Sequence, residues 1–192
     1  MKNGETKNQA KQVAFCGMAA AVSVVLMMLS AIIPVFGYVG PMAASLALLW
    51  VLENFGKKAA ILTWVAAAAL ILILGPDKES AFFYVFFGWY PIAKPALDGI
   101  RSGFFRRLVK FLLFLLLSVA MDLVLIKVLG ITYEEDIPSE LQSSLNALGV
   151  DVPTILFFME AVFCLIMAGT MALYDVLLGR LSKTKFFRRK RV

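Results

Sequence analysis

The stretch that decides the fold runs from residue 13 to residue 36 and reads VAFCGMAAAVSVVLMMLSAIIPVF. It contains no charged residue. At a rise of about 1.5 Å per residue, a helix of this length covers the roughly 30 Å of a bilayer's hydrocarbon core. It is too long for the apolar part of a signal peptide and lacks a convincing cleavage site at its end. We therefore expect it to remain as a transmembrane helix.

The composition of the whole chain agrees with a membrane protein. Residues of the AVILMFWYC set make up 61% of the 192 residues, and Asp, Glu, Lys and Arg only 17%. Soluble proteins contain about 45–50% apolar residues even with glycine included. The sequence has no histidine, which excludes imidazole metal sites and catalysis by Ser-His or Cys-His systems. Cys16 and Cys164 both lie inside apolar runs and are predicted to be buried thiols.

Six apolar stretches are long enough to cross a bilayer, so we predict an all-α integral membrane protein, a compact six-helix bundle in one domain. The second stretch is short and follows Gly37, Gly40 and Pro41, which we expect to form a tight turn. The fourth is interrupted at Gly88 and Pro91, where we expect a broken or kinked helix. The six predicted spans are 13–36, 38–55, 59–75, 80–100, 108–131 and 152–178.

Lysine and arginine are distributed unevenly between the predicted loops. Sixteen of the nineteen basic residues fall in the N-terminal segment, in the loops after the second and fourth spans, and in the tail. The other loops are acidic. The positive-inside rule then places both termini in the cytoplasm, which requires an even number of spans. We expect a multi-pass protein of the cell (plasma) membrane, with a cytoplasmic segment at 1–12 and a basic cytoplasmic tail at 181–192.

Two segments outside the spans have patterns of their own. In the outer loop 132–151, four apolar residues recur at helical spacing, which is typical of a short amphipathic helix. Such a helix either rests on lipid headgroups or closes over an outward-facing cavity. The tail combines basic residues with Phe186 and Phe187, and we expect it to attract anionic lipids rather than nucleic acid. The four apolar residues of the outer loop are Ile137, Leu141, Leu145 and Leu148.

Charged residues inside the spans carry the functional hypothesis, because each is costly in hydrocarbon unless it faces protein or water. Asp122 in the fifth span and Glu160 in the sixth are predicted to lie roughly 12–13 Å below the outer surface. The interrupted part of the fourth span, with Trp89, falls at roughly 12–17 Å, in the same layer. Aromatic faces bind rings and cations and carboxylates select amines, so we predict a pocket in the outward half. Its candidate substrate-binding residues are Asp122, Glu160, Trp89, Tyr90, Tyr84 and Gly88.

This pocket favours a small cationic or amine-bearing, ring-containing substrate, and the lack of histidine argues against a transition metal. Structural alternatives stay open for the same charges. Asp122 and Glu160 can satisfy each other by sharing a proton, or can interact with Lys127 or Ser118. Lys94, deeper in the fourth span, either pairs with an acid or supports the floor of the pocket. The acids considered as its partners are Asp98, Glu53 and Asp175.

The first span also carries a stripe of small residues. Ala10, Ala14, Gly17 and Ala21 follow the 4, 3, 4 spacing of one helix face, and such faces allow another helix to approach closely. The stripe is explained either by tight packing inside the chain's own bundle or by docking against another membrane subunit.

Taken together, the size, the six spans, the cytoplasmic termini, the small-residue step and the outward pocket resemble the substrate-binding S components of energy-coupling factor (ECF) transporters. The family's Ala-x-x-x-Ala step in the first helix is matched by Ala10 and Ala14, and less literally by Gly17 and Ala21; counting on from Ala14 gives Met18 instead. The resemblance implies capture of a vitamin or micronutrient, a transmembrane coupling protein on the first helix, and two ATP-binding subunits that power release. The family's substrate residues vary with the substrate, so none is carried over.

The sequence favours a protein without enzymatic activity or cofactor. It lacks the phosphate-binding motif G-x-x-x-x-G-K-[ST], so energy from ATP must come from partners. The Asp-Gly-Ile-Arg segment at 98–101 is not followed by the further aspartates that CDP-alcohol phosphotransferases require, none occurring before Asp122. The alternative class is a non-transporting membrane scaffold or assembly factor. An ion-coupled carrier using Asp122 and Glu160 is less favoured, because six spans without a repeat would need to dimerise.

Overall fold

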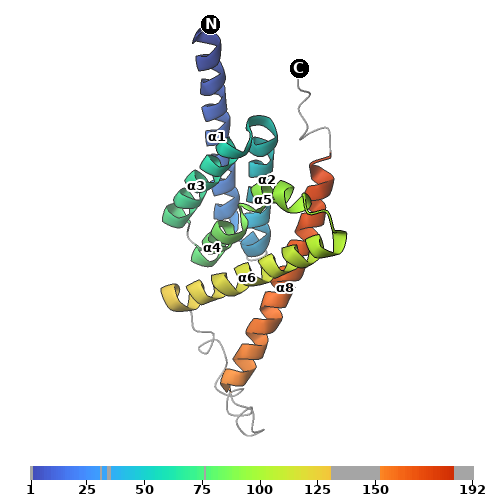
Figure 1. Cartoon of the computed structure of the whole chain (residues 1–192). Helices are drawn as coiled ribbons and strands as arrows, with labels where there is room; N and C mark the ends of the chain where they lie inside the picture. The colour runs from blue at the N-terminus through green and yellow to red at the C-terminus, as the bar shows by residue number, and fades with distance from the viewer. Residues whose placement is uncertain (1, 31, 34–35, 76, 131–151, 184–192) are drawn as a thin grey trace. The chain divides into compact units, whose positions relative to one another are not determined.

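The computed structural model describes residues 2–30, 32–33, 36–75, 77–130 and 152–183, and the regular structure of these residues is entirely α-helical (Figure 1). The predicted outer-loop helix and most of the basic tail lie outside the described residues. The helices are α1 (Lys2–Ser30), α2 (Phe36–Phe55), α3 (Lys57–Leu74), α4 (Lys78–Phe87), α5 (Tyr90–Asp98), α6 (Gly103–Leu129) and α8 (Val152–Leu181).

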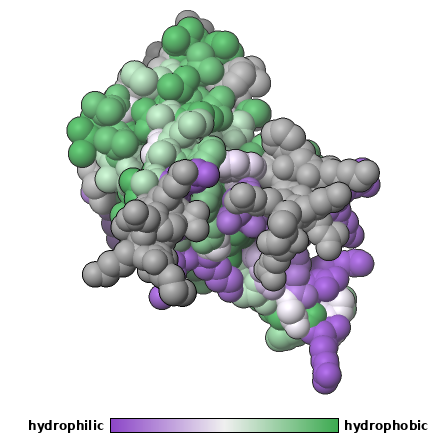
Figure 2. Space-filling model, turned by 90° about the horizontal axis from the view of Figure 1, so that it is seen from above, coloured by the Kyte–Doolittle hydropathy of each residue, from purple (hydrophilic) through white to green (hydrophobic). Residues whose placement is uncertain are grey.

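Four of these helices are long and apolar enough to cross a membrane, judged over the described residues. Their apolar windows match the first, third, fifth and sixth predicted spans, and the second predicted span is the shorter apolar helix Val39–Phe55. Large hydrophobic side chains also remain exposed along these helices. Figure 2 shows apolar residues covering a broad, continuous part of the face it draws. A soluble monomer rarely exposes such areas, so the structure confirms an all-α membrane-embedded protein. The apolar windows are Gln9–Leu29, Lys57–Leu74, Gly103–Lys127 and Thr154–Leu181.

The chain divides into two compact units. The first comprises Met1–Arg106 and Tyr174–Val192, and the second comprises Arg107–Leu173. Helix α8 therefore contributes its last turns to the first unit and the rest of its length to the second. Each unit is described by itself below.

Small side chains form much of the core of the first unit, where α1, α2, α3 and α4 contact one another. Alanine is well suited to this position, because it lets helix backbones approach closely without leaving a cavity. Two buried clusters result, one on each side of Trp64, which packs against both. The first contains Ala20, Ala44, Ala67, Ala68, Ala81 and Tyr84 among others, and the second contains Ala19, Val51, Ala59, Ala60 and Ile92.

Two predicted boundaries were wrong. Helix α1 covers Lys2–Ser30, so it ends at Ser30 rather than at residue 36, where the first predicted span ended. Its early end is consistent with Pro34, which disfavours helical backbone in the preceding residues. The predicted start of the second span was also wrong. The tight turn expected before it is not formed, because α2 already begins at Phe36.

The Gly-rich segment predicted to turn lies instead within the first turns of α2. Pro41 stands inside the helix and is buried. Gly37 lies so close to α4 that an added Cβ atom would be 3.6 Å from Ser80 Oγ. These residues therefore permit close packing of two helices, a role that a sequence pattern typical of turns does not reveal.

The predicted interruption of the fourth span is confirmed. Helix α4 ends at Phe87 and α5 begins at Tyr90, with Gly88 and Trp89 between them (Figure 1). Pro91 lacks an amide hydrogen, so it cannot donate the helical hydrogen bond to the carbonyl of Phe87. The chain consequently breaks one turn before this proline.

Candidate functional site

The α4–α5 break holds four of the predicted substrate-binding residues, all in the first unit. Tyr84 and Tyr90 are completely buried, whereas Trp89 is half-buried. Gly88 ends α4, and its amide donates to the carbonyl of Tyr84 at 2.7 Å. Among these residues, the indole of Trp89 is the one that keeps a surface available for a ligand.

The hydroxyl of Tyr84 is unusual because it is buried without a hydrogen bond of standard geometry in the described part of the chain. It lies close to Ser23. The Ser23 hydroxyl is directed at backbone carbonyls, those of Ala19 at 3.0 Å and Ala44 at 3.1 Å. An unsatisfied hydroxyl in an apolar core is costly, so Tyr84 is a place where a water or a ligand group would be stabilised.

Tyr90 belongs to a charged cluster that also contains the largely buried Lys94 and Asp175 and the exposed Asp98; we refer to these four residues as the Lys94 cluster. The Tyr90 hydroxyl donates to Asp175 Oδ1 at 2.6 Å. Lys94 Nζ donates to the same carboxylate oxygen and, at 2.9 Å, to the backbone carbonyl of Asp175. Asp98 Oδ2 lies 3.5 Å from Lys94 Nζ. One ammonium group thus lies between two carboxylates.

The Lys94 cluster confirms the prediction of a paired lysine. Of the three acids considered, Asp98 and Asp175 contact Lys94, and Glu53 is exposed elsewhere. The side chains of Lys94 and Asp175 are only 11% and 17% exposed, so both charges are largely removed from solvent. A buried ion pair of this kind requires close geometry and further hydrogen bonds, which Tyr90 supplies.

A second set of hydrogen bonds fastens the same part of α8 to α2. Tyr174 and Ser45 share a hydrogen bond between their hydroxyl groups. Both hydroxyls also lie within hydrogen-bonding distance of the backbone carbonyl of Met42. The distance to the carbonyl oxygen is 2.6 Å from Ser45 Oγ and 3.2 Å from Tyr174 Oη. The rings of Tyr90 and Tyr174 are 6.5 Å apart. Ser45 and Tyr174 were not predicted as site residues, because single hydroxyls in apolar spans do not indicate which helices they join.

The two predicted carboxylates lie in the second unit. Asp122 on α6 is buried, and Glu160 on α8 is half-buried. They are near enough to interact electrostatically, and both also act on the buried thiol of Cys164. Ser118, considered as a partner for the acids, is buried without a hydrogen bond to any described residue, so that alternative was wrong. Lys127 is exposed.

The predicted layer therefore joins residues of two different units. Tyr84, Gly88, Trp89 and Tyr90 lie in the first, and the two acids lie in the second. Within each unit the predicted neighbours are brought together. The meeting of the aromatic group with the acids stays a prediction.

The small-residue stripe of α1 is exposed along its whole length. Ala10, Ala14, Gly17 and Ala21 all face outward, and a Cβ atom added to Gly17 would meet nothing within 4 Å. The face of α1 that packs in the core carries other residues, including Ser23 and Met27. The stripe therefore does not pack in the core of the first unit, and the choice between packing within the chain's own bundle and docking against another subunit stays a prediction.

No group of three or more His, Cys, Asp or Glu side chains with the arrangement of a metal site occurs among the described residues. The largely buried charges of the first unit, Lys94 and Asp175, are joined in the Lys94 cluster, which is best described as a structural ion pair. Surfaces open to a ligand or partner include Trp89, the half-buried Glu160 and the exposed face of α1.

Gly179 provides a direct test of the Lys94 cluster. A Cβ atom at this position would lie 3.7 Å from Lys94 Nζ and 3.9 Å from its Cε, so the glycine makes room for the lysine. We expect Gly179→Leu to displace Lys94 and to lower the free energy of unfolding in detergent micelles by about 1–3 kcal/mol. Gly169→Leu is the matched control in the same helix, since its Cβ would meet nothing within 4 Å, and should change stability by less than about 0.5 kcal/mol. Equal effects of the two substitutions would contradict this assignment.

Comparisons with protein-family models, with curated proteins and with solved structures find no match to this chain. Its function is therefore argued from its own residues.

Proposed function

We propose that the chain is the substrate-capture subunit of an uptake transporter of the ECF type, the S component. In this role it binds a vitamin or other micronutrient from outside and relies on a transmembrane coupling protein and two ATP-binding subunits. It is placed in the plasma membrane with six spans and both termini in the cytoplasm, where the basic tail contacts anionic lipids. The observation that carries the proposal is the exposed small-residue stripe of α1.

The stripe supports docking because its four residues leave the backbone of α1 accessible. In a membrane, apolar side chains gain little by moving from lipid to protein, so helices associate where small residues permit close van der Waals contact. Gly17 lies in the middle of the stripe with open space around it. A helix of the coupling protein that approaches at this point would contact backbone directly.

The proposed substrate-binding groups are the indole of Trp89 in the first unit and the carboxylates of Asp122 and Glu160 in the second. The half-buried indole offers a face for a ring or a cation. A positively charged ligand group between two neighbouring carboxylates is favoured, because it offsets the repulsion between them. Tyr84, Gly88 and Tyr90 shape the helix break behind the indole. A small amine-bearing, ring-containing compound fits this chemistry.

A non-transporting scaffold or assembly factor is the second candidate. One observation favours it: the Lys94 cluster is fully paired within the chain, as expected of charges retained for structure. If the same holds for Asp122 and Glu160, the chain has no ligand to bind, and the exposed stripe serves assembly alone.

The pocket is tested by purifying the full-length protein without partners and identifying co-purifying small molecules by mass spectrometry. We expect one small molecule to be retained, and Glu160→Gln or Trp89→Ala to reduce its amount by roughly tenfold, as for the loss of a charge-assisted contact. Glu53→Gln and Phe157→Ala, at exposed positions, are the matched controls. Unchanged retention of the ligand in both pocket variants would contradict the proposed pocket. Absence of a ligand under every condition would favour the scaffold function.

Docking is tested by co-purification of membrane partners with the tagged protein. The double variant Ala14→Leu and Gly17→Leu fills the stripe with branched side chains, and we expect it to lose a partner that the unmodified protein retains. The control, Ala66→Leu and Ala69→Leu, makes the same kind of change on the exposed side of α3. Both variants should fold, because all four positions point outward. Recovery of the same partners by both variants would contradict docking at the stripe.

A further inference from the structure

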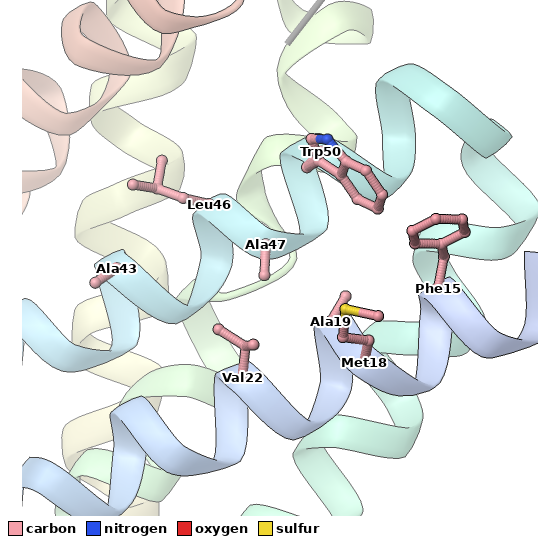
Figure 3. A pocket seen from close by; sticks show the side chains of 8 residues that line it. All are labelled: Phe15, Met18, Ala19, Val22, Ala43, Leu46, Ala47 and Trp50. Carbon is pink, nitrogen blue, oxygen red and sulfur yellow. The ribbon is translucent and has the colours of Figure 1, made fainter. Parts of the chain in front are cut away.

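An apolar groove lies between α1 and α2 of the first unit, with a volume of about 410 Å³. Figure 3 shows Phe15, Met18 and Val22 projecting from α1 along one side. Ala43 and Ala47 of α2 leave space on the other side because their side chains are short (Figure 3). The remaining lining residues are apolar as well. The groove therefore suits a hydrocarbon ligand rather than a polar one.

The length of the groove fits the acyl chain of a lipid. From Phe15 to Val22, α1 rises by about 10 Å. The hydrocarbon core of a bilayer is about 30 Å thick, so one leaflet spans about 15 Å and the groove is shorter than that. One acyl chain of a phospholipid stays within a leaflet and can lie along a groove of this length.

One end of the groove carries an aromatic cluster formed by Phe15, Trp50 and Phe55. The ring of Phe15 lies 5.3 Å from that of Trp50 and 5.8 Å from that of Phe55, and the last two are 6.1 Å apart. Figure 3 shows Phe15 and Trp50 together at this end of the groove. Tryptophan is enriched where hydrocarbon meets the headgroups, so this end indicates the membrane surface.

Three exposed lysines lie just beyond the aromatic cluster. Lys11 is one turn before Phe15 on α1, on the stripe of that helix that lines the groove. Lys57 and Lys58 follow Phe55 by two and three residues, which places their Cα atoms within about 7–11 Å of it. In the described part of the chain none of the three forms an ion pair.

The positive charge at this end exceeds the negative charge of the described acidic side chains close to it in the sequence. Glu53 is an exposed acid one turn before Lys57. Its single negative charge is smaller than the combined positive charge of the three lysines. Gly56 precedes α3 and gives it no side-chain cap, which leaves the amides of the first turn in need of an acceptor. A phosphate group can form ion pairs with the lysines and accept hydrogen bonds from these amides.

We propose that the groove binds one acyl chain of an anionic phospholipid, with the phosphate at Lys11, Lys57 and Lys58. This site is separate from the docking surface proposed above. With 100° between successive residues of a helix, the stripe from Ala10 to Ala21 is turned by roughly 120° around α1 from the groove. A lipid and a protein partner can therefore contact α1 at the same time, and the lipid site does not depend on the proposed transport function.

The proposal is tested by native mass spectrometry of the full-length protein from nanodiscs that contain equal amounts of phosphatidylglycerol and phosphatidylcholine with the same chains. We expect one phosphatidylglycerol molecule to be retained in preference to phosphatidylcholine. Lys57→Gln or Lys58→Gln should each lower that retention by about fivefold, the effect of removing one basic residue near an anionic lipid. Arg101→Gln, at an exposed position of the first unit that does not line the groove, should leave it unchanged.

A second pair of variants tests the acyl chain. Met18 lines the groove and is 59% exposed, so Met18→Trp fills the groove without disturbing the core. We expect it to lower retention of phosphatidylglycerol at least fivefold. Met28→Trp, at a methionine that is 47% exposed outside the groove, is the control. Equal retention of the two lipids would overturn the proposal. Loss on Lys substitution without loss in Met18→Trp would also overturn it, because the lysines would then bind headgroups alone. So would a photoreactive residue at position 18 that captures a protein instead of a lipid.

Discussion

A lysine placed inside an apolar helical bundle must keep its charge paired, and this constraint organises the first unit. Lys94 satisfies this constraint by forming ion pairs with Asp175, near the end of α8, and with Asp98, one turn away on its own helix. The same aspartate accepts a hydrogen bond from Tyr90, which begins α5. The pair thus fixes the second half of the broken span against α8, while Ser45 and Tyr174 fix α8 against α2. Without these bonds, the break at Gly88 would be a weak point rather than a defined bend.

Around this framework, α1 presents three faces with different chemistry. One packs through Ala20, Ser23 and Met27 into a core rich in alanine. A second exposes the small-residue stripe, and a third lines the apolar groove next to α2. Because each face has a separate stripe of residues, one helix can support the bundle, dock a partner and hold a lipid without conflict. The proposed transport role uses the second face, and the proposed lipid site uses the third.

The sequence predicted those features that depend on the cost of placing polar groups in hydrocarbon. Long apolar runs identified four helices that could span a membrane, and Gly88 with Pro91 identified the break, because a proline removes a donor wherever it stands. The pairing of Lys94 was predicted for the same reason, although the choice among three acids was not, since helix rotation is set by packing.

Features set by packing between helices were predicted less well. Gly37 and Pro41 have the composition of a turn, yet they lie in α2, with Gly37 near Ser80 of α4. The hydroxyl bonds of Ser45 and Tyr174, and the space at Gly179 for Lys94, join residues more than eighty positions apart. The stripe on α1 was identified from its spacing, but only the structure distinguishes an exposed face from a buried one.

The most direct test of this account is a double-mutant cycle on Lys94 and Asp175, measured as the free energy of unfolding of the full-length protein in mixed micelles. Removing either partner alone, by Lys94→Met or Asp175→Leu, should cost about 3–5 kcal/mol because one charge is left buried. The double variant should recover much of that loss, with a coupling energy of at least about 2 kcal/mol. Strictly additive effects, within about 0.5 kcal/mol, would contradict the view that this ion pair holds the broken span in place.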